Sequence, residues 1–175
     1  MTPRLLSLLI APALLFSAPA FATQEFYVGE PVVKEGLQIV PAYLVGVEMD
    51  SMPAGMSMSK TAVHLEVDIH ATEAETHGFK EDSWIPYLTI AYTLTKDGAP
   101  TYKKTGFLQP MIAKDGPHYA NNVDMGGDGT YHLTYIISPP SSHGFIRHVD
   151  KDGGVPVWWK PITANWTFTY PAKKK

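Results

Sequence analysis

The sequence predicts an all-β protein, an antiparallel β-sandwich of the immunoglobulin-like kind. About seven segments with strand character recur at short spacing, and turn residues separate them. No stretch shows a convincing amphipathic helix of useful length. The run Asp128–Leu133 places Tyr131 two residues before an apolar strand position, which is typical of a tyrosine corner. In this interpretation Leu133 takes the place of the strand cysteine of antibody domains, and Trp84 is the core tryptophan.

The first 22 residues have the pattern of a secretory signal peptide. Arg4 precedes an almost wholly apolar run from Leu5 to Phe16, and an Ala20-x-Ala22 cleavage site follows. The apolar run is shorter than the roughly 20 residues that a membrane span needs. We therefore expect residues 1–22 to be removed and residues 23–175 to form one exported β-sandwich domain. No membrane insertion of the mature chain is expected.

The composition narrows the possible functions. The chain has no cysteine, which excludes disulfides, iron–sulfur clusters and thiolate metal sites. Its formal net charge is −3, and loss of Arg4 with the signal peptide makes it −4, which argues against nucleic acid as a partner. Seven histidines and seven methionines supply nitrogen and sulfur donors of the kinds that bind metals.

The first predicted strand is Leu37–Val47, an apolar run in which Pro41 indicates an edge or a bulge. Met49–Met58 follows as a loop, because it contains proline, glycine and serine. Four of these residues are methionine, and such a thioether cluster could bind copper. The favoured interpretation is instead an apolar loop that covers the end of the sandwich.

The segment Ala62–His70 alternates as an almost ideal strand. One face is aliphatic and predicts a contact with the core, whereas the other carries only His64, Glu66, Asp68 and His70. Residues two apart on a strand are separated by about 6–7 Å, so His64 and Glu66 can share one ion. His64 and His70 are roughly 20 Å apart and cannot. An ordinary solvated strand face would produce the same alternation.

The strands Trp84–Thr95 and Thr101–Ile112 are predicted to form a hairpin, with a turn at Lys96–Gly98 and a break near Pro110. Asp115–Tyr119 is then expected to be a loop.

The last part of the chain contains two more predicted strands. Thr130–Ser138 and Ala164–Tyr170 have strand character, and the polar stretch His143–Gly154 between them is expected to be a loop.

Three more side chains could complete a metal site near the Ala62–His70 strand. Met111 ends a predicted strand, His118 follows it across a turn, and His148 lies in the polar loop. Imidazoles with one thioether and one carboxylate suit copper in either oxidation state, and hold ferrous iron or zinc less tightly. No nucleophile elbow, phosphate loop or catalytic-triad spacing occurs. A catalytic pair of Glu66 and Asp68 is disfavoured, so we expect a binding protein and not an enzyme.

Four motifs together resemble one known family across nearly the whole exported chain. They are Ala62–Ala71 (AVHLEVDIHA), Trp84–Ile90 (WIPYLTI), Asp115–Tyr119 (DGPHY) and Trp158–Pro161 (WWKP). The chain is similar to the periplasmic high-affinity iron-transport proteins, which accompany an inner-membrane iron permease. The resemblance implies an immunoglobulin-like sandwich, a homodimer and a periplasmic location. It also implies a metal site made of His64, Glu66, Met111, His118 and His148, which binds copper although the physiological role is iron uptake.

The resulting hypothesis is a periplasmic protein that captures iron and delivers it to an inner-membrane iron permease, through a site that also takes a copper ion. Two alternatives remain open. A copper-trafficking or copper-resistance protein would use the same His and Met donors. An immunoglobulin-like adhesion or assembly module would carry its histidine-rich face incidentally.

Overall fold

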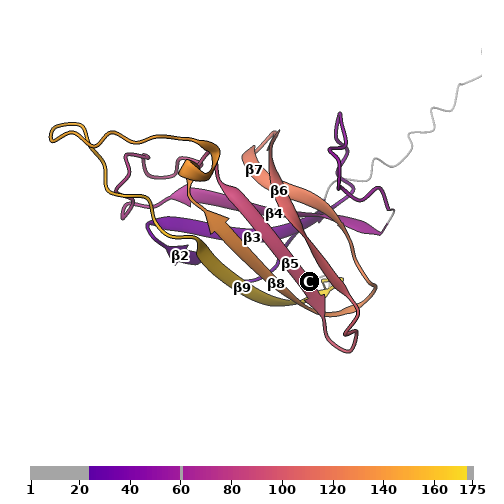
Figure 1. The fold of residues 1–175 in the computed structure, drawn as a ribbon. Helices are drawn as coiled ribbons and strands as arrows, with labels where there is room; N and C mark the ends of the chain where they lie inside the picture. Colours follow the sequence, from indigo (N-terminus) through magenta and orange to yellow (C-terminus); the bar gives the residue numbers. More distant parts are fainter. Residues whose placement is uncertain (1–23, 60, 173–175) are drawn as a thin grey trace, which may run out of the picture.

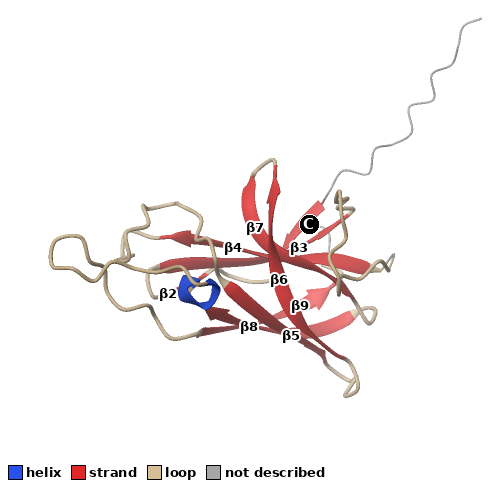
Figure 2. Ribbon diagram, turned by 45° about the horizontal axis from the view of Figure 1, so that its top comes forward, coloured by secondary structure: helices blue, strands red, loops and turns tan. Residues whose placement is uncertain are grey.

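The computed structural model describes residues 24–59 and 61–172, so the predicted signal peptide, residues 1–22, lies outside the described residues. Nine strands and one short 3-10 helix occur in the described part, in the order shown in Figure 1. Their bounds are β1 (Gln24–Tyr27), β2 (Val32–Lys34), β3 (Leu37–Val45), β4 (Ala62–Ala71), β5 (Thr89–Lys96), β6 (Lys103–Ala113), β7 (Gly116–Asp124), β8 (Gly129–Ser138), η1 (Pro140–His143) and β9 (Ile162–Tyr170). The predicted all-β, antiparallel architecture is confirmed. Figure 2 shows from a second direction how strands dominate the molecule.

Strand β6 belongs to both layers of the sandwich. Its first part, Lys103–Leu108, pairs with β5, and its second part, Gln109–Ala113, pairs with β7. One layer therefore has the order β1-β3-β4-β7-β6, with β2 also on β3, and the other has the order β6-β5-β8-β9. The break predicted near Pro110 is in fact the place where a continuous strand changes layers (Figure 1).

Strand β3 is not itself an edge, although Pro41 suggested one. On its outer side β1 pairs with residues 42–45 and β2 pairs with residues 37–39. Pro41 lies between these two ladders, and its carbonyl accepts a hydrogen bond of 3.0 Å from the Val28 N–H. A proline is tolerated there because its missing N–H falls where the outer ladder is interrupted.

The tyrosine corner forms as predicted. Tyr131 is fully buried and its hydroxyl donates to the Gly127 carbonyl, while Leu133 is fully buried in the core. The assignment of Trp84 as the core tryptophan is wrong. Trp84 is only partly buried, and its ring stacks on Tyr119. It lies outside the core strand, because β5 begins five residues later, at Thr89.

Two local features explain that late start of β5. Pro86 has no N–H to donate to a ladder, and Tyr87 has a φ of 62°, outside the extended region. The tryptophans that are buried in the described residues are Trp159 and Trp166.

The expected loop Asp115–Tyr119 is also wrong in most of its length. A two-residue turn at Lys114 and Asp115 separates β6 from β7, with Ala113 paired to Gly116. His118 therefore lies within a strand and not in a loop. Glycine and proline at the start of β7 produced the loop pattern, and both are compatible with the first residues of a strand.

Candidate metal centre

The polar face of β4 is buried where the site begins. The aliphatic face of β4 lies in the core as predicted, yet His64 is only 4% exposed and Glu66 only 7% exposed. The solvated-face interpretation therefore fails at these two positions. A cavity of about 950 Å³ opens above them, with walls from the loop after β3 and from the β6–β7 hairpin. Two ionisable side chains held beneath such a cavity require partners.

The strand register brings distant residues onto this face. His64 pairs with Asn122 on β7, and Met111 on β6 pairs directly with His118 on β7. Opposite residues in an antiparallel ladder point to the same face, so the ladder collects all four over one layer. Glu66 is flanked by alanines on both neighbouring strands, and their small side chains leave space beside its carboxylate.

Three donor atoms converge in the structure. His64 Nε2 lies 3.9 Å from Glu66 Oε2, and His118 Nε2 lies 3.7 Å from the same oxygen. The two imidazole rings are nearly perpendicular, at 86°, with centroids 5.7 Å apart. All three ligand atoms lie within 4.8 Å of one another, which is the spacing that one ion with bonds of about 2 Å would bridge.

Asn122 fixes the orientation of the His64 ring. The amide oxygen of Asn122 is 2.8 Å from His64 Nδ1 and can only accept, so Nδ1 carries the proton. The Nε2 lone pair of His64 is consequently left facing Glu66 and His118. A hydrogen bond to the ring nitrogen that faces away from the metal sets the tautomer and the direction of a ligating histidine.

An unsatisfied atom supports a cation at this position. His118 Nε2 is buried and has no hydrogen-bond partner. A buried polar atom without a partner is uncommon in folded proteins. Met111 lies beside it in the ladder and lines the same cavity, which adds a thioether to the donor set. The residues present therefore fit a metal ion.

Burial and nearby carboxylates set the protonation of the donor side chains in the absence of an ion. Burial, with the negative charges of Asp68, Glu25 and Asp115, raises the pKa of Glu66 to about 8. Burial also lowers the pKa of His64, against the opposing effect of its bond to Asn122. At neutral pH Glu66 is therefore mostly protonated and His64 is neutral, the state in which imidazole binds metal. A cation bound by the Glu66 carboxylate would therefore take the place of its proton.

The sequence did not reveal several residues that shape this site. Glu25 and Asp115 act on the Glu66 carboxylate, and Asn122 orients His64. Met49 and Glu48 line the cavity from the loop after β3. Their contributions depend on strand pairing over long sequence separations, which no local pattern encodes.

The methionine-rich loop lies next to the site and forms part of the cavity wall. Met56 is buried, and the Met52 sulfur accepts from the Asn122 side-chain amide at 3.8 Å. Met58 is largely exposed.

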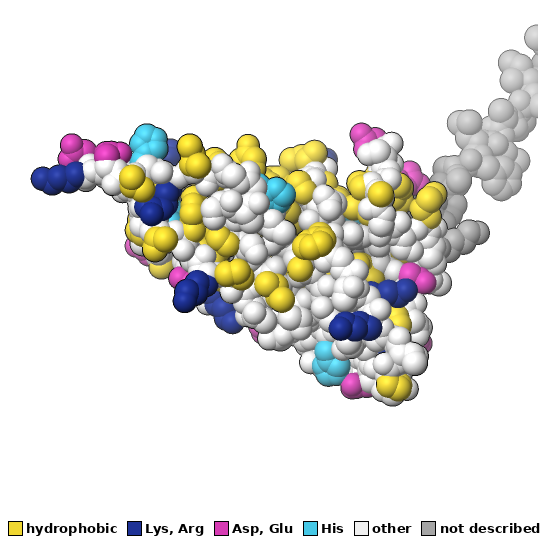
Figure 3. Space-filling view, viewed as in Figure 1, with side chains coloured by type: hydrophobic (Ala, Val, Ile, Leu, Met, Phe, Trp, Pro, Cys, Tyr) yellow, Lys and Arg dark blue, Asp and Glu magenta, His cyan; other side chains and the backbone are white. Residues whose placement is uncertain are grey.

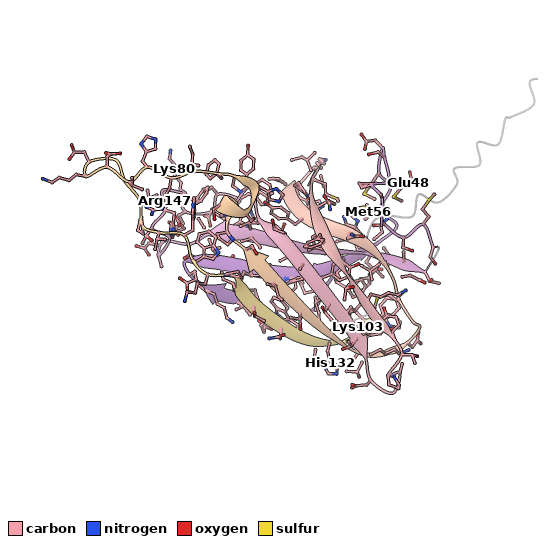
Figure 4. All side chains as sticks on the ribbon, viewed as in Figure 1. Glu48, Met56, Lys80, Lys103, His132 and Arg147 are labelled. Carbon is pink, nitrogen blue, oxygen red and sulfur yellow. The ribbon has the colours of Figure 1, made fainter. Side chains whose placement is uncertain are left out.

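His148 is not part of the cluster within one chain. Its side chain is 81% exposed, and the nearest carboxylate oxygen, on Asp150, is 3.5 Å from its Nδ1. Its neighbour Arg147 lies at the opposite end of the molecule from Met56 and Glu48 (Figure 4). One chain thus brings together His64, Glu66, Met111 and His118, and leaves His148 apart.

Comparison with known proteins places these residues in a family context. The family model described as "Fe2+ transport protein" matches residues 22–172. A UPF0423 protein of Brucella abortus is 41% identical over 172 residues, which cover 95% of this chain and 93% of that protein. The 34 kDa membrane antigen of Treponema pallidum is 36% identical over 147 residues, or 81% of this chain and 72% of that protein.

Solved structures also resemble this chain. FetP of uropathogenic Escherichia coli superimposes with a TM-score of 0.77 at 44% identity, covering 84% of this chain and 96% of FetP. A copper-bound glutamate-to-glutamine variant of FetP gives a TM-score of 0.79 at 42% identity, covering 86% and 99%. Copper-reconstituted P19 of Campylobacter jejuni gives 0.77 at 41% identity, covering 87% and 99%. In the described part of this chain no helix is long and apolar enough to cross a membrane.

Proposed function

Because this chain belongs to the Fe2+ transport protein family, we propose that it captures iron in the periplasm and delivers it to an inner-membrane permease, through a site that also binds copper. The observation that carries this proposal is the buried convergence of His64, Glu66 and His118 beneath an open cavity. The bound ion is cargo, so the site must both hold it and release it. An open cavity above a layer of hydrogen-bonded strands meets both needs.

The donor set divides between soft and hard ligands. The imidazoles of His64 and His118 with the thioether of Met111 satisfy copper. The carboxylate of Glu66 adds a hard oxygen, which suits iron or manganese. Loss of Glu66 should therefore weaken binding of the harder ions more than binding of copper.

His148 can join this site only from a second copy of the chain. The family resemblance implies both a homodimer and a role for His148, and the fold keeps His148 apart from the cluster of its own chain. Exposed Ile146 and Val149 flank it, and the cavity has an exposed apolar rim residue, Ile112. Apolar contact between these residues would seat the second copy and bring one more imidazole to the cavity. Sedimentation that shows only a monomer near 17 kDa would contradict this arrangement.

Metal titrations test the proposed site. Cu(II) and Mn(II), an air-stable substitute for Fe(II), would be titrated into wild type, His118→Ala and Glu66→Gln. We expect about one Cu(II) per chain. Loss of a residue that only hydrogen-bonds to a ligand weakens metal binding by about 10–100-fold, so loss of the ligand itself in His118→Ala should weaken it at least as much. His132→Ala is the matched control, because His132 is an exposed histidine bonded to Asp97 at 2.8 Å. Unchanged tight binding by His118→Ala would remove that residue from the site.

The titration of Glu66→Gln tests the division between soft and hard ions. We expect a larger loss of Mn(II) than of Cu(II) affinity. Equal losses for both metals, or none for either, would refute that division.

Copper handling is a second candidate function. The copper-bound structures of FetP and P19 favour it, since both proteins resemble this chain along most of its length. Growth of a deletion strain separates the two functions. A defect under iron starvation supports iron uptake, whereas a defect confined to copper excess supports copper handling.

A further inference from the structure

The connection between η1 and β9 is longer than an ordinary loop. It spans residues 144–161 without a strand, whereas loops longer than about 12–15 residues are uncommon unless they serve a function. We call residues 146–157 the arm. Figure 1 shows the arm projecting from one end of the sandwich, and Figure 3 shows apolar and charged side chains gathered at that end. The arm carries His148.

The arm has internal order despite its exposure. Arg147 Nη1 donates to the Val155 carbonyl at 2.9 Å, and the Val155 N–H donates to the His148 carbonyl at 3.1 Å. At the tip, Asp150 Oδ1 accepts from the Gly153 N–H at 2.7 Å. These hydrogen bonds are all within the arm. The direction of the arm relative to the sandwich therefore depends on contacts at its base, where its two ends join the rest of the domain.

Both ends of the arm rest on one aromatic cluster. Phe145, just before the arm, stacks on Tyr87 with ring centroids 5.0 Å apart. Trp158, just after it, stacks on His77 at 5.0 Å and an interplanar angle of 10°. Phe79 contacts the rings of both Phe145 and Trp158. The cluster therefore joins the two ends of the arm to the segment that follows β4.

A buried pair of side chains, Glu75 and His77, lies at the centre of this base. The Glu75 side chain has no exposed surface, and its Oε1 lies 2.7 Å from both the backbone N and Nδ1 of His77. The Phe79 N–H donates to Glu75 Oε2 at 3.1 Å. His77 Nε2 lies 3.1 Å from the Val157 carbonyl.

These contacts fix the orientation of the His77 ring. A carbonyl oxygen can only accept, so Nε2 carries a hydrogen, and Nδ1 faces a carboxylate oxygen that already accepts from a backbone N–H. Both ring nitrogens of His77 are therefore held by oxygen atoms, one by Glu75 Oε1 and the other by the Val157 carbonyl. The His77 ring also stacks on the face of Trp158, and the Trp159 ring lies at 79° to it with the centroids 5.2 Å apart.

We propose that the Glu75–His77 pair positions the arm, so that His148 reaches the metal cavity of a second copy of this chain. This inference rests on the proposed function, in which His148 is supplied by that second copy. His77 bonds the last residue of the arm, Val157, and stacks on the next residue, Trp158. Without this hydrogen-bonded pair, the base loses its directional bond to Val157 and the arm loses its fixed direction. The metal site then loses one imidazole although its own residues are intact.

Variants of the full exported chain test the proposal. His77→Phe keeps a flat ring against Trp158 but removes the hydrogen bonds of the ring. Glu75→Gln replaces one of the two accepting carboxylate oxygens with an amide nitrogen, which cannot accept. His148→Ala supplies the reference for loss of the ligand itself. His132→Phe is the matched control, because His132 also pairs with a carboxylate, Asp97, but at the surface. Cu(II) affinity and the Cu(II) electron paramagnetic resonance spectrum would be measured for each.

We expect His148→Ala to lower Cu(II) affinity about 10–100-fold and to remove one nitrogen from the spectrum. His77→Phe should do the same, and the double variant should be no worse than either single one, because both changes remove the same ligand. Trypsin should cut the arm after Arg147 and Lys151 faster in His77→Phe and in Glu75→Gln. The His132→Phe control should match wild type in every measurement.

Two results would overturn the proposal. His77→Phe that unfolds at a lower temperature but retains the wild-type Cu(II) spectrum would make the pair a merely structural contact. His148→Ala with wild-type Cu(II) binding would remove the ligand that the pair is proposed to position. Neither result touches the cluster of His64, Glu66 and His118, which His118→Ala tests separately.

Discussion

Replacement of Glu66 by glutamine should stabilise the metal-free protein, and only at high pH. In the folded chain the pKa of Glu66 is raised to about 8 from 4.5, chiefly by burial. In the unfolded chain Glu66 loses its proton near pH 4.5, whereas in the folded chain it holds the proton up to about pH 8. The free energy of unfolding is therefore highest below pH 4.5 and falls as pH rises from about 4.5 through 8. Glutamine has no proton to lose, so the variant avoids that loss.

The size of the effect follows from the shift. At 1.36 kcal/mol per pKa unit, the shift of the Glu66 pKa lowers the free energy of unfolding at high pH by at most about 5 kcal/mol. Water reaches the carboxyl group through the open cavity, and this reduces the effect to about 2 kcal/mol. For a domain of this length, about 2 kcal/mol raises the Tm by about 4–8 °C. We therefore expect Glu66→Gln to match wild type near pH 4.5 and to unfold several degrees higher at pH 9.

Thermal unfolding followed by circular dichroism, with a chelator present, measures this difference at pH 4.5, 7 and 9. Glu48→Gln is the matched control, because it removes an exposed carboxylate from the same cavity and should give little difference at any pH. A Glu66→Gln variant that is no more stable than wild type at pH 9 would refute the reasoning. A difference that does not change with pH would refute it equally.

Three further predictions concern neighbouring parts of the molecule. Calorimetric titration of Cu(II) in two buffers at pH 7 should show release of about one proton from Glu66, and no such release in Glu66→Gln. Asn122→Ala should weaken Cu(II) binding about 10–100-fold by freeing the His64 ring, and wild-type affinity would contradict that role. Tyr131→Phe should cost about 1 kcal/mol in urea unfolding and leave Cu(II) affinity unchanged, whereas altered affinity would show that the tyrosine corner is coupled to the site.

The sequence predicted those parts of the fold that depend on residues close together in the chain. The alternation of β4 is encoded in neighbouring residues, and so is the tyrosine corner around Tyr131. The burial of His64 and Glu66 could not be read from β4, because the cover comes from the loop after β3 and from the β6–β7 hairpin. His118 looked like a loop residue because Gly116 and Pro117 precede it, and only the pairing with β6 shows that it lies in a strand.

The candidate site shows the same division. Metal-binding residue types on one strand face indicated His64 and Glu66 directly. Met111 and His118 became specific only through the family resemblance, and the ladder then placed them side by side. His148 has no local pattern that separates it from a surface histidine, and within one chain it remains a surface histidine.

Anomalous diffraction from crystals soaked in Cu(II) tests the central claim most directly. The proposed site requires a copper peak in the cavity, about 2 Å from Nε2 of both His64 and His118, with the Met111 sulfur beside it. A peak only at exposed histidines such as His132, with none between His64 and His118, would contradict it.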